Sequence, residues 1–299
     1  MKYRTDLAIE NVEMYDEEQE QAGGKTGDID GIEMEKIEYD EDIKVTRIKV
    51  KDLKGEAILQ KPIGNYVTLE VDGLIDGKIG LKERAAKALG EELKNLINFH
   101  YYLKVLVVGL GNDKVTPDAL GPYTVSKVRV TRHWFIIYEA DGDEEQSCVS
   151  GFIPGVMGST GMETAELIKQ AADIVKPEII LVVDSLAARN IGRISTTIQI
   201  NDTGISPGAG MGNHRTMLNE KTLGCRVVAV GVPTVIDSST LIMDALEGYI
   251  KNPVEVENYI EQNGQDMIVT STDIDQVIKD FSDIIADGIN ITLHPGIYS

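Results

Sequence analysis

Two aspartates that follow aliphatic runs have the clearest potential for chemistry in this sequence. Asp184 comes directly after the run 179–183, and Asp118 follows the run 105–108 after a glycine-containing loop. β-Branched runs of this kind are typical of parallel strands buried on both faces, and catalytic groups gather beyond the carboxyl ends of such strands. Two carboxylates in one crevice can share a proton and act as general base and general acid, or hold a metal with a third ligand. Each is equally compatible with capping a helix or closing a loop.

The other reactive side chains give weaker signals. His214 lies in a glycine-rich loop, where it could be a third metal ligand or a proton donor, although a surface histidine is the commoner outcome. Cys148 and Cys225 are far apart, with no metal-type spacing and no activating neighbour, so we expect two reduced thiols. Segment 109–114 lacks the third glycine of a dinucleotide fingerprint, and neither Gly-x-Ser-x-Gly nor His-Glu-x-x-His occurs. We therefore expect no cofactor, with a divalent metal as the alternative.

The elements that must position these residues alternate between strand and helix. Continuous apolar runs predict buried strands, and helical spacing of apolar residues predicts amphipathic helices between and after them. The expected strands are 43–50, 66–71, 105–108, 179–183 and 227–232, and the expected helices are 81–98, 161–175, 238–250 and 272–289. This order predicts an α/β fold: a mostly parallel sheet flanked by helices in three layers, with a smaller N-terminal β-containing subregion.

Charge is concentrated near the N-terminus. Of the 299 residues, 49 are Asp or Glu and 29 are Lys or Arg, and residues 1–42 alone hold 15 acidic against 4 basic side chains. Segment 11–42 is polar and contains Gly23, Gly24 and Gly27, so we expect a loop or a loosely ordered segment. An acidic surface repels phosphate backbones, which argues against nucleic-acid binding, and it could attract a basic or mixed-charge polypeptide or simply keep the protein soluble.

The bulk composition is that of a soluble globular protein. Hydrophobic residues make up 42% and charged residues 26% of the chain. No apolar run approaches the roughly 20 residues that a membrane helix needs, and the first residues lack the apolar core of a secretory signal. We therefore expect a cytoplasmic protein with no membrane association.

A set of ordered motifs resembles one family. The resemblance runs from about residue 103 to 245. Its motifs are GLGN at 109–112, VTPDALGP at 115–122, TRH at 131–133, PGVMG at 154–158, D-x-LAAR at 184–189, TIQI at 197–200, DTGI at 202–205, GNHR at 212–215 and VVAVGVPTVID at 227–237. Together they resemble the germination protease of spore-forming bacteria, the endopeptidase that degrades small acid-soluble spore proteins.

The resemblance implies an activity and a site. It places the two essential aspartates of an atypical aspartic-type protease on Asp118 and Asp184. It also implies a homotetramer in the forespore or spore core, made as a zymogen that removes its own N-terminal segment. The core fold is expected to be similar to that of hydrogenase maturation proteases, whose acidic residues and histidine bind nickel, so a metal stays possible here.

The N-terminus is similar to the sequence that the family cuts in its substrates. Segment 5–10, Thr-Asp-Leu-Ala-Ile-Glu, carries the acidic–hydrophobic–Ala–x–acidic pattern. We expect self-cleavage between Asp6 and Leu7, and we expect the segment around residues 1–10 to block the cleft before that. The resulting division is a propeptide at 1–6, an N-terminal region at 7–100 and a catalytic core at 101–299. An ordinary frayed terminus is the alternative.

Two other functions stay open at this point. One is a metal-dependent maturation protease that trims a single enzyme precursor, with His214 as the first candidate for the third ligand. The other is a non-catalytic binding module that keeps the same fold. It requires one of the two aspartates to be dispensable, and both are present.

Overall fold

The computed structural model describes residues 3–21, 29–211, 215–246, 249–250, 252–263 and 267–298. Within these ranges nine strands form one sheet in the order β1-β2-β3-β7-β8-β6-β4-β5, with β9 paired to β8. The strands are β1 (Ile32–Glu38), β2 (Ile43–Val50), β3 (Gly64–Val71), β4 (Lys104–Gly109), β5 (Cys148–Phe152), β6 (Ile179–Ala187), β7 (Thr197–Asn201), β8 (Arg226–Asp237) and β9 (Ile268–Val269).

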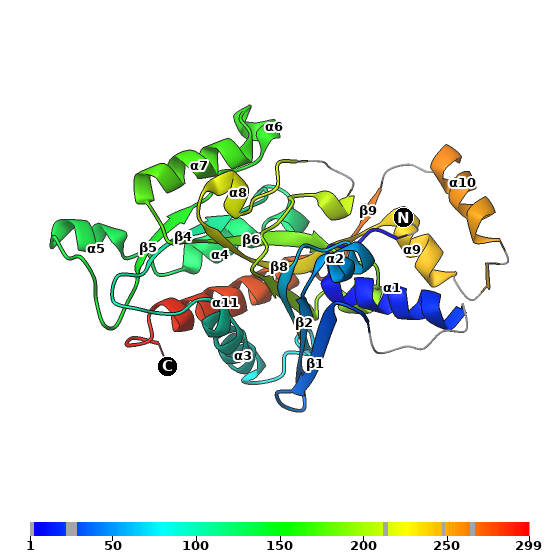
Figure 1. Ribbon diagram of the computed structural model, residues 1–299, viewed down its shortest axis with the longest axis horizontal. Coiled ribbons are helices and arrows are strands. Elements are labelled where there is room, and N and C mark those ends of the chain that lie inside the picture. Colours follow the sequence, from blue (N-terminus) through cyan, green and yellow to red (C-terminus); the bar gives the residue numbers. More distant parts are fainter. Residues whose placement is uncertain are drawn as a thin grey trace.

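The helices cover both faces of the sheet. They are α1 (Ala8–Gln21), α2 (Leu53–Leu59), α3 (Leu81–Leu96), α4 (Leu120–Lys127), α5 (Arg132–Ile137), α6 (Met157–Thr160), α7 (Thr164–Val175), α8 (Glu220–Leu223), α9 (Ser238–Ala245), α10 (Pro253–Asn263) and α11 (Ile274–Leu293). Figure 1 shows α3 and α11 below the strands and α7 and α8 above them. The predicted α/β fold with flanking helices is therefore confirmed.

The strands at the centre of the molecule are parallel and buried on both faces. β4 pairs in parallel with β5 and β6, and β6 pairs in parallel with β8. Alternate side chains of β4 and β6 enter two different cores: Val107 and Val183 pack toward α3 and α11, whereas Val108 and Val182 pack toward α7 and α8. Burial on both faces explains why these strands read as continuous aliphatic runs in the sequence.

The N-terminal half of the sheet is antiparallel. β1, β2 and β3 form a meander that joins the rest through β3, which pairs antiparallel with β7, and β7 pairs antiparallel with β8. The sheet as a whole is thus mixed, and the expected N-terminal β subregion is continuous with the core. The division at residues 6 and 100 stays a prediction.

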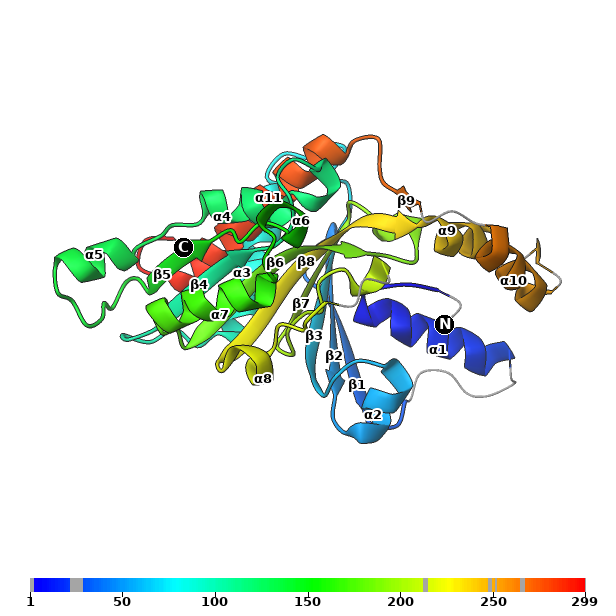
Figure 2. The same cartoon turned by 90° about the horizontal axis from the view of Figure 1, so that it is seen from above.

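The expectation of a loop over residues 11–42 was wrong for 11–21 and 32–38, whereas residues 22–28, with the three glycines, lie outside the described residues. Residues 8–21 form α1, and residues 32–38 form the edge strand β1. Figure 2 shows α1 beside the β1–β3 half of the sheet. The acidic side chains that suggested a solvated segment are partly paired with arginines far along the chain, as in the bond from Arg193 to Glu13 and the 2.8 Å ion pair between Arg189 and Glu17. Ion pairs between residues this far apart in the sequence cannot be predicted from the residues next to them.

Several element ends also differ from the prediction. β8 runs on to Asp237, whose side chain accepts a 2.9 Å hydrogen bond from the Thr240 N–H and so caps α9, which ends at Ala245 rather than residue 250. The expected helix 161–175 begins only at Thr164, because Gly161, with a φ of +70°, is the C-cap of the preceding helix α6. The last helix extends to Leu293.

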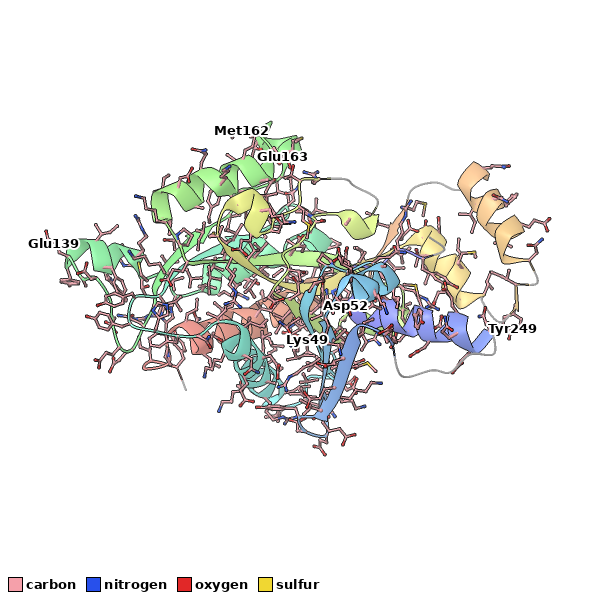
Figure 3. The ribbon with its side chains drawn as sticks, in the orientation of Figure 1. Lys49, Asp52, Glu139, Met162, Glu163 and Tyr249 are labelled. Atoms are coloured by element: carbon pink, nitrogen blue, oxygen red, sulfur yellow. The ribbon has the colours of Figure 1, made fainter. Side chains whose placement is uncertain are left out.

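The outline of the molecule is elongated. In Figure 3 Glu139 lies at one end, beyond α5, and Tyr249 lies at the other, between α9 and α10. Among the described helices, none has the length and apolar character needed to cross a bilayer.

Candidate functional site

Asp118 and Asp184 line the same cavity. It has a volume of about 440 Å³ and lies at the carboxyl ends of β4, β6 and β8. Its other lining residues include Asp6, Arg215 and Thr234, together with apolar groups from the loops after β4 and β5. The structure thus brings together the two aspartates singled out from the sequence, at the edge where a parallel sheet holds ligands.

Close glycine contacts place Asp118 at this edge. A Cβ on Gly121 would lie 2.3 Å from the Leu110 carbonyl oxygen and 2.6 Å from that of Val183, so only glycine lets α4 pack directly on the ends of β4 and β6. Gly111 (φ +106°) likewise leaves room for the Asp118 carbonyl, which accepts a 2.9 Å hydrogen bond from the Asn112 N–H. The short 3₁₀ turn Thr116–Asp118 is held against the sheet in this way.

Asp184 belongs to β6 itself. It pairs with Gly231 of β8 and is only 5% exposed, and its Oδ1 accepts a 2.9 Å hydrogen bond from the Ser185 N–H. Neither aspartate caps a helix: Asp184 lies inside a strand, and the N-cap of α4 is Ala119. The capping alternative was therefore wrong for both residues.

The two carboxyl groups have raised pKa values. Burial raises the pKa of Asp118 to about 6, against the opposing effects of the Asn112 N–H and the Arg215 charge. The pKa of Asp184 lies well above its usual value, because of burial first and then the nearby charges of Asp118 and Asp6. Two buried acidic groups in one cavity, of which Asp118 raises the pKa of Asp184, favour a state in which one is protonated and the other ionised.

The N-terminal segment enters the same cavity through Asp6. Both carboxylate oxygens of Asp6 accept 2.9 Å hydrogen bonds, one from the Ala187 N–H and one from the Gly210 N–H. The Asp6 N–H in turn donates to the Ala187 carbonyl at 2.9 Å. The segment is thus bound along the end of β6, three residues beyond Asp184, so the alternative of a frayed terminus was wrong for the described residues from Tyr3 onward.

The carbonyl oxygen of Asp6 has two side-chain donors of its own. Lys61 Nζ donates to it at 2.9 Å and Gln199 Nε2 at 3.1 Å. These donors line a second cavity of about 230 Å³, and Asp6 lines both cavities. Burial lowers the pKa of Lys61, against the charges of Asp6 and Glu10. Asp6 therefore lies between the two aspartates on one side and a lysine–glutamine pair on the other.

A second acidic residue of the segment is also bound by main-chain N–H groups that follow β6. Glu10 is 1% exposed, and its carboxylate accepts hydrogen bonds from the Arg189 N–H at 2.7 Å and the Asn190 N–H at 2.9 Å. Thr5 also donates its hydroxyl to Glu10. Leu7 between them is fully buried. Every side chain of the acidic–hydrophobic–Ala–x–acidic pattern is consequently held by the protein.

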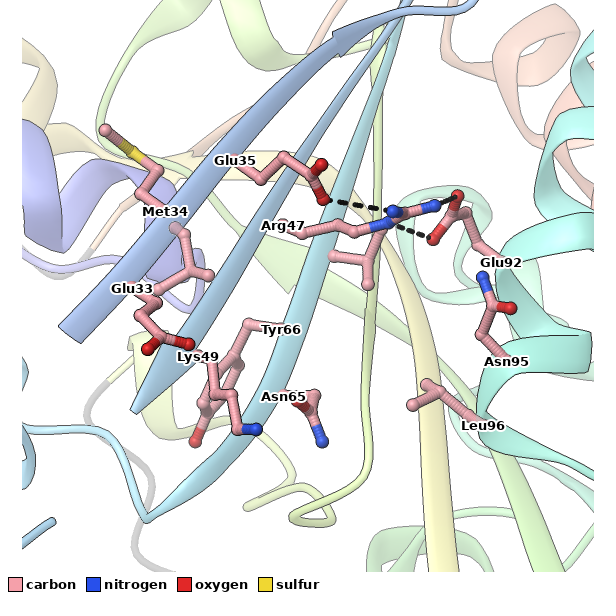
Figure 4. A pocket seen from close by; sticks show the side chains of 12 residues that line it. Glu33, Met34, Glu35, Arg47, Lys49, Asn65, Tyr66, Glu92, Asn95 and Leu96 are labelled. Atoms are coloured by element: carbon pink, nitrogen blue, oxygen red, sulfur yellow. Dashed lines mark hydrogen bonds and ion pairs between the residues drawn. The ribbon is translucent and has the colours of Figure 1, made fainter. Parts of the chain in front are cut away.

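A larger hollow exists elsewhere and offers less chemistry. It has a volume of about 650 Å³ and lies between the outer strands β1–β3 and α3 (Figure 4). Its central cation, Arg47, is bound by Glu92 at 2.7 Å and by Glu35 at 3.1 Å. With this charge neutralised and no aspartate pair on its walls, the hollow is a poorer candidate than the smaller cavity.

Residues that could hold a metal are not assembled in the part of the chain that the structure describes. There, no group of three or more His, Cys, Asp or Glu side chains has a metal-binding arrangement. His214, the third ligand suggested by the sequence, lies outside the described residues. Of the two cysteines, Cys148 is buried and Cys225 half-buried, and both are free.

Three residues of the site carried no recognisable signal in the sequence. Lys61 follows α2 and precedes a proline, Gln199 lies in β7, and Arg215 ends the GNHR motif. Gln199 and Arg215 fall inside motifs that indicated the family, but nothing local assigned them a role. Lys61 could have been found only by knowing that it meets Asp6, 55 positions earlier.

An α/β fold that holds paired carboxyl groups of raised pKa at its strand ends is the kind of framework that hydrolases use to activate water. The family model of the germination proteases matches residues 8–258. The chain is 40% identical to the germination protease of Caldanaerobacter subterraneus subsp. tengcongensis over 98% of its own length and 95% of the relative's. It is 40% identical to that of Clostridium tetani (99% and 97% covered) and 33% identical to that of Bacillus cereus (97% and 93%). This chain belongs to the germination protease family and is therefore a peptide-bond hydrolase.

Among solved structures, the chain overlaps a NiFe hydrogenase maturation protease, HycI from Thermococcus kodakarensis. The TM-score is 0.34 at 14% identity, over 67% of this chain and 99% of the other. An overlap of this size does not bear on the mechanism.

Proposed function

We propose that this protein is the endopeptidase that initiates degradation of small acid-soluble spore proteins during germination, and that Asp118 and Asp184 activate the attacking water. The family supports the peptidase activity. The observation that carries the mechanism is the shared cavity, in which Asp118 contributes to raising the pKa of Asp184.

The unequal environments of the two carboxyl groups suggest separate roles. Asp118, with a pKa near 6, is ionised at neutral pH and can accept a proton from water. Asp184 is more deeply buried, and burial together with the nearby carboxylates raises its pKa well above its usual value, so its protonated form is favoured and can donate to the leaving amine. The pair carries one proton throughout the reaction, and this proton has moved from Asp184 to Asp118 at the end, so it must return to Asp184 before the next cycle.

We further propose that the chain is a zymogen that cuts its own Asp6–Leu7 bond. The bound state of Asp6 supports this, because its carboxylate and main chain are held at the end of β6 and Asp6 lines the cavity that contains both aspartates. A segment that occupies the cavity also excludes other substrates until it is removed. The same subsites would then accept the acidic and hydrophobic residues of a spore protein.

The partners and location follow from the same proposal. Small acid-soluble spore proteins are the substrates, the enzyme is a homotetramer in the cytoplasm of the forespore and spore core, and neither nucleic acid nor membrane is bound directly. The formal charge of −20 supports the absence of a nucleic-acid surface.

The test is cleavage by wild-type, Asp118→Asn and Asp184→Asn chains. Intact-mass measurement follows loss of residues 1–6, and gel analysis follows digestion of a purified small acid-soluble spore protein, each with and without chelator. We expect the wild type to lose six residues and both variants to lose activity by more than a hundredfold. The Asn side chains keep the shape and remove the titrating group.

Two outcomes would overturn the proposal. Full activity of either Asn variant excludes the aspartate pair. Activity that disappears with chelator and returns with one divalent metal replaces it with a metal-dependent reaction, for which His214 is the first residue to substitute.

A further inference from the structure

The contacts around the Asp6 carbonyl are unusual for a main-chain group. This carbonyl lies outside the sheet ladders, and it accepts from a lysine ammonium at 2.9 Å and a glutamine amide at 3.1 Å. Both donors come from distant elements, Lys61 from the turn after α2 and Gln199 from β7. They converge on the one carbonyl that belongs to the proposed cleavage site.

The arrangement is one that stabilises charge on oxygen. When water attacks a peptide carbonyl, the carbonyl oxygen becomes an oxyanion, and preorganised donors about 2.7–3.1 Å away stabilise it in a low-dielectric site. Lys61 and Gln199 meet that distance criterion. The positive charge of Lys61 suits a developing anion better than it suits a neutral carbonyl, so its contribution grows as the reaction proceeds.

The two cavities contain different groups that could act on the Asp6–Leu7 bond. Both aspartates line the larger cavity, and Lys61 and Gln199 line the smaller one, with Asp6 on the boundary. The charge of Lys61 acts on the Asp6 carboxylate and lowers its pKa against the effect of burial, but the hydrogen bond of Lys61 is made to a different oxygen. That carboxylate is already bound by two N–H groups, and the lysine hydrogen bond goes to the carbonyl oxygen instead.

We propose that Lys61 and Gln199 form the oxyanion site of the self-cleavage reaction, which rests on the function proposed above. Water oxygen bonds to the Asp6 carbonyl carbon while Asp118 takes a water proton, and the carbonyl electron pair moves to the oxygen between Lys61 and Gln199. The C–N bond to Leu7 then breaks as its nitrogen receives the proton of Asp184. The products are a carboxyl group on Asp6 and an amino group on Leu7, with no other reactant consumed.

Gln199 has a second contact that fixes its orientation. Its Oε1 accepts a 2.6 Å hydrogen bond from the Ala8 N–H, so the amide is held between the two sides of the Asp6–Leu7 bond. This contact turns Nε2 toward the Asp6 carbonyl. Gln199→Glu keeps the acceptor for Ala8 and removes the donor to Asp6, which makes it a specific probe of the oxyanion role.

The experiment measures self-cleavage of the full chain by intact mass in Lys61→Met, Lys61→Arg and Gln199→Glu. Lys169→Met, an exposed lysine of α7, is the matched control. We expect Lys61→Met and Gln199→Glu to slow cleavage by roughly 10²–10³, Lys61→Arg to recover at least tenfold over Lys61→Met, and the control to equal the wild type. Amide hydrogen exchange at Ala187, whose N–H is covered by Asp6, reports whether the segment stays bound.

The readouts separate an oxyanion role from a merely structural one. Slow cleavage with retained Ala187 protection and rescue by arginine supports the proposal. Cleavage within threefold of wild type in Lys61→Met overturns it, and so does slow cleavage accompanied by loss of protection, which means that the segment has left its site. If Lys61→Met does not fold, the same criteria are applied to Gln199→Glu. Failure of the wild type to cut at Asp6–Leu7, or normal cutting by Asp184→Asn, refutes the proposed function and this inference with it.

Discussion

Asp6 and Ala187 are joined in both directions: the Asp6 N–H donates to the Ala187 carbonyl, and the Ala187 N–H donates to the Asp6 carboxylate, each at 2.9 Å. Ala187 is the last residue of β6, and Asp184 is three positions before it. The D-x-LAAR motif is therefore a single extended segment that carries one of the paired carboxyl groups and binds the segment predicted to be cut.

Replacing Asp118 with asparagine should stabilise the protein at neutral pH. The pKa of Asp118 is about 6 in the folded chain against 3.8 for a free group, so the folded state binds the proton more tightly. Stability is then lost as pH rises between these values and stays lower above them. We expect Asp118→Asn to gain about 2 kcal/mol at pH 7, after allowance for partial exposure, and almost nothing at pH 3.5.

Urea unfolding at both pH values checks this. Asp113→Asn, an exposed position in the same loop, is the control and should change the free energy of unfolding by less than about 0.5 kcal/mol. An equal gain at both pH values would show that the effect does not come from the proton.

Gly121 should tolerate no side chain. A Cβ there would meet backbone atoms of Leu110 at 2.3 and 2.5 Å, so α4 must move away from the sheet and take Asp118 with it. We expect Gly121→Ala to lower the free energy of unfolding by at least about 1–3 kcal/mol and to reduce peptide cleavage strongly. Gly158→Ala is the matched control, because nothing lies within 4 Å of its added Cβ. Equal activity of the two variants would rule out the packing argument.

Arg193 should be more important for stability than a surface ion pair. Its side chain is 11% exposed and binds Glu13 of α1 and, at 2.9 Å, Glu70 of β3. It also lies 3.7 Å from the carboxylate of Glu10, which is 1% exposed, and removing it leaves this buried group without its cation, so we expect Arg193→Met to cost about 2–4 kcal/mol and to make α1 sensitive to protease. Lys54→Met, which breaks the exposed pair with Asp30, should cost less than about 1 kcal/mol. Similar unfolding midpoints for both variants would contradict this ranking.

Arg215 should set the acidic limit of the reaction. Its charge lowers the pKa of Asp118, which is nevertheless about 6. Below that pH Asp118 is protonated and no longer accepts a proton from water, so the cleavage rate falls. In Arg215→Gln the limit should move to higher pH, measured as the rate of self-cleavage between pH 4.5 and 8. Lys221→Gln, an exposed substitution on α8, should leave the profile unchanged, and a shift to lower pH in Arg215→Gln would refute the assignment.

The sequence predicted well what depends on local pattern. Strands β4, β6 and β8 were found because burial on both faces produces uninterrupted aliphatic runs, and the position of Asp184 after such a run placed it at the sheet edge. The prediction for the acidic N-terminal segment was wrong because its helix, α1, is stabilised by ion pairs with Arg189 and Arg193, which lie more than 170 residues further along the chain. A prediction from neighbouring residues takes account of the acidic side chains of α1 but not of the two arginines with which they pair in the folded chain.

The residues of the site also differ in whether a local sequence pattern or only a contact between distant segments indicates their role. Asp118 and Asp184 could be singled out because each follows an aliphatic run in the sequence. A role for Lys61 becomes evident only in the folded chain, where β3 pairs with β7 and residues 6, 61 and 199 come together. The antiparallel pairing that extends the sheet is thus also what completes the surroundings of the Asp6 carbonyl.

Asp6 is held at β6 by the chain to which it belongs, and this has a consequence for the kinetics of the proposed self-cleavage. If the Asp6–Leu7 bond is cut as proposed, it is cut within the molecule that already holds it, so we expect a half-time of cleavage that is independent of protein concentration. The supply of ready enzyme then depends on elapsed time and conditions, and a thousandfold dilution leaves the fraction converted at any moment unchanged.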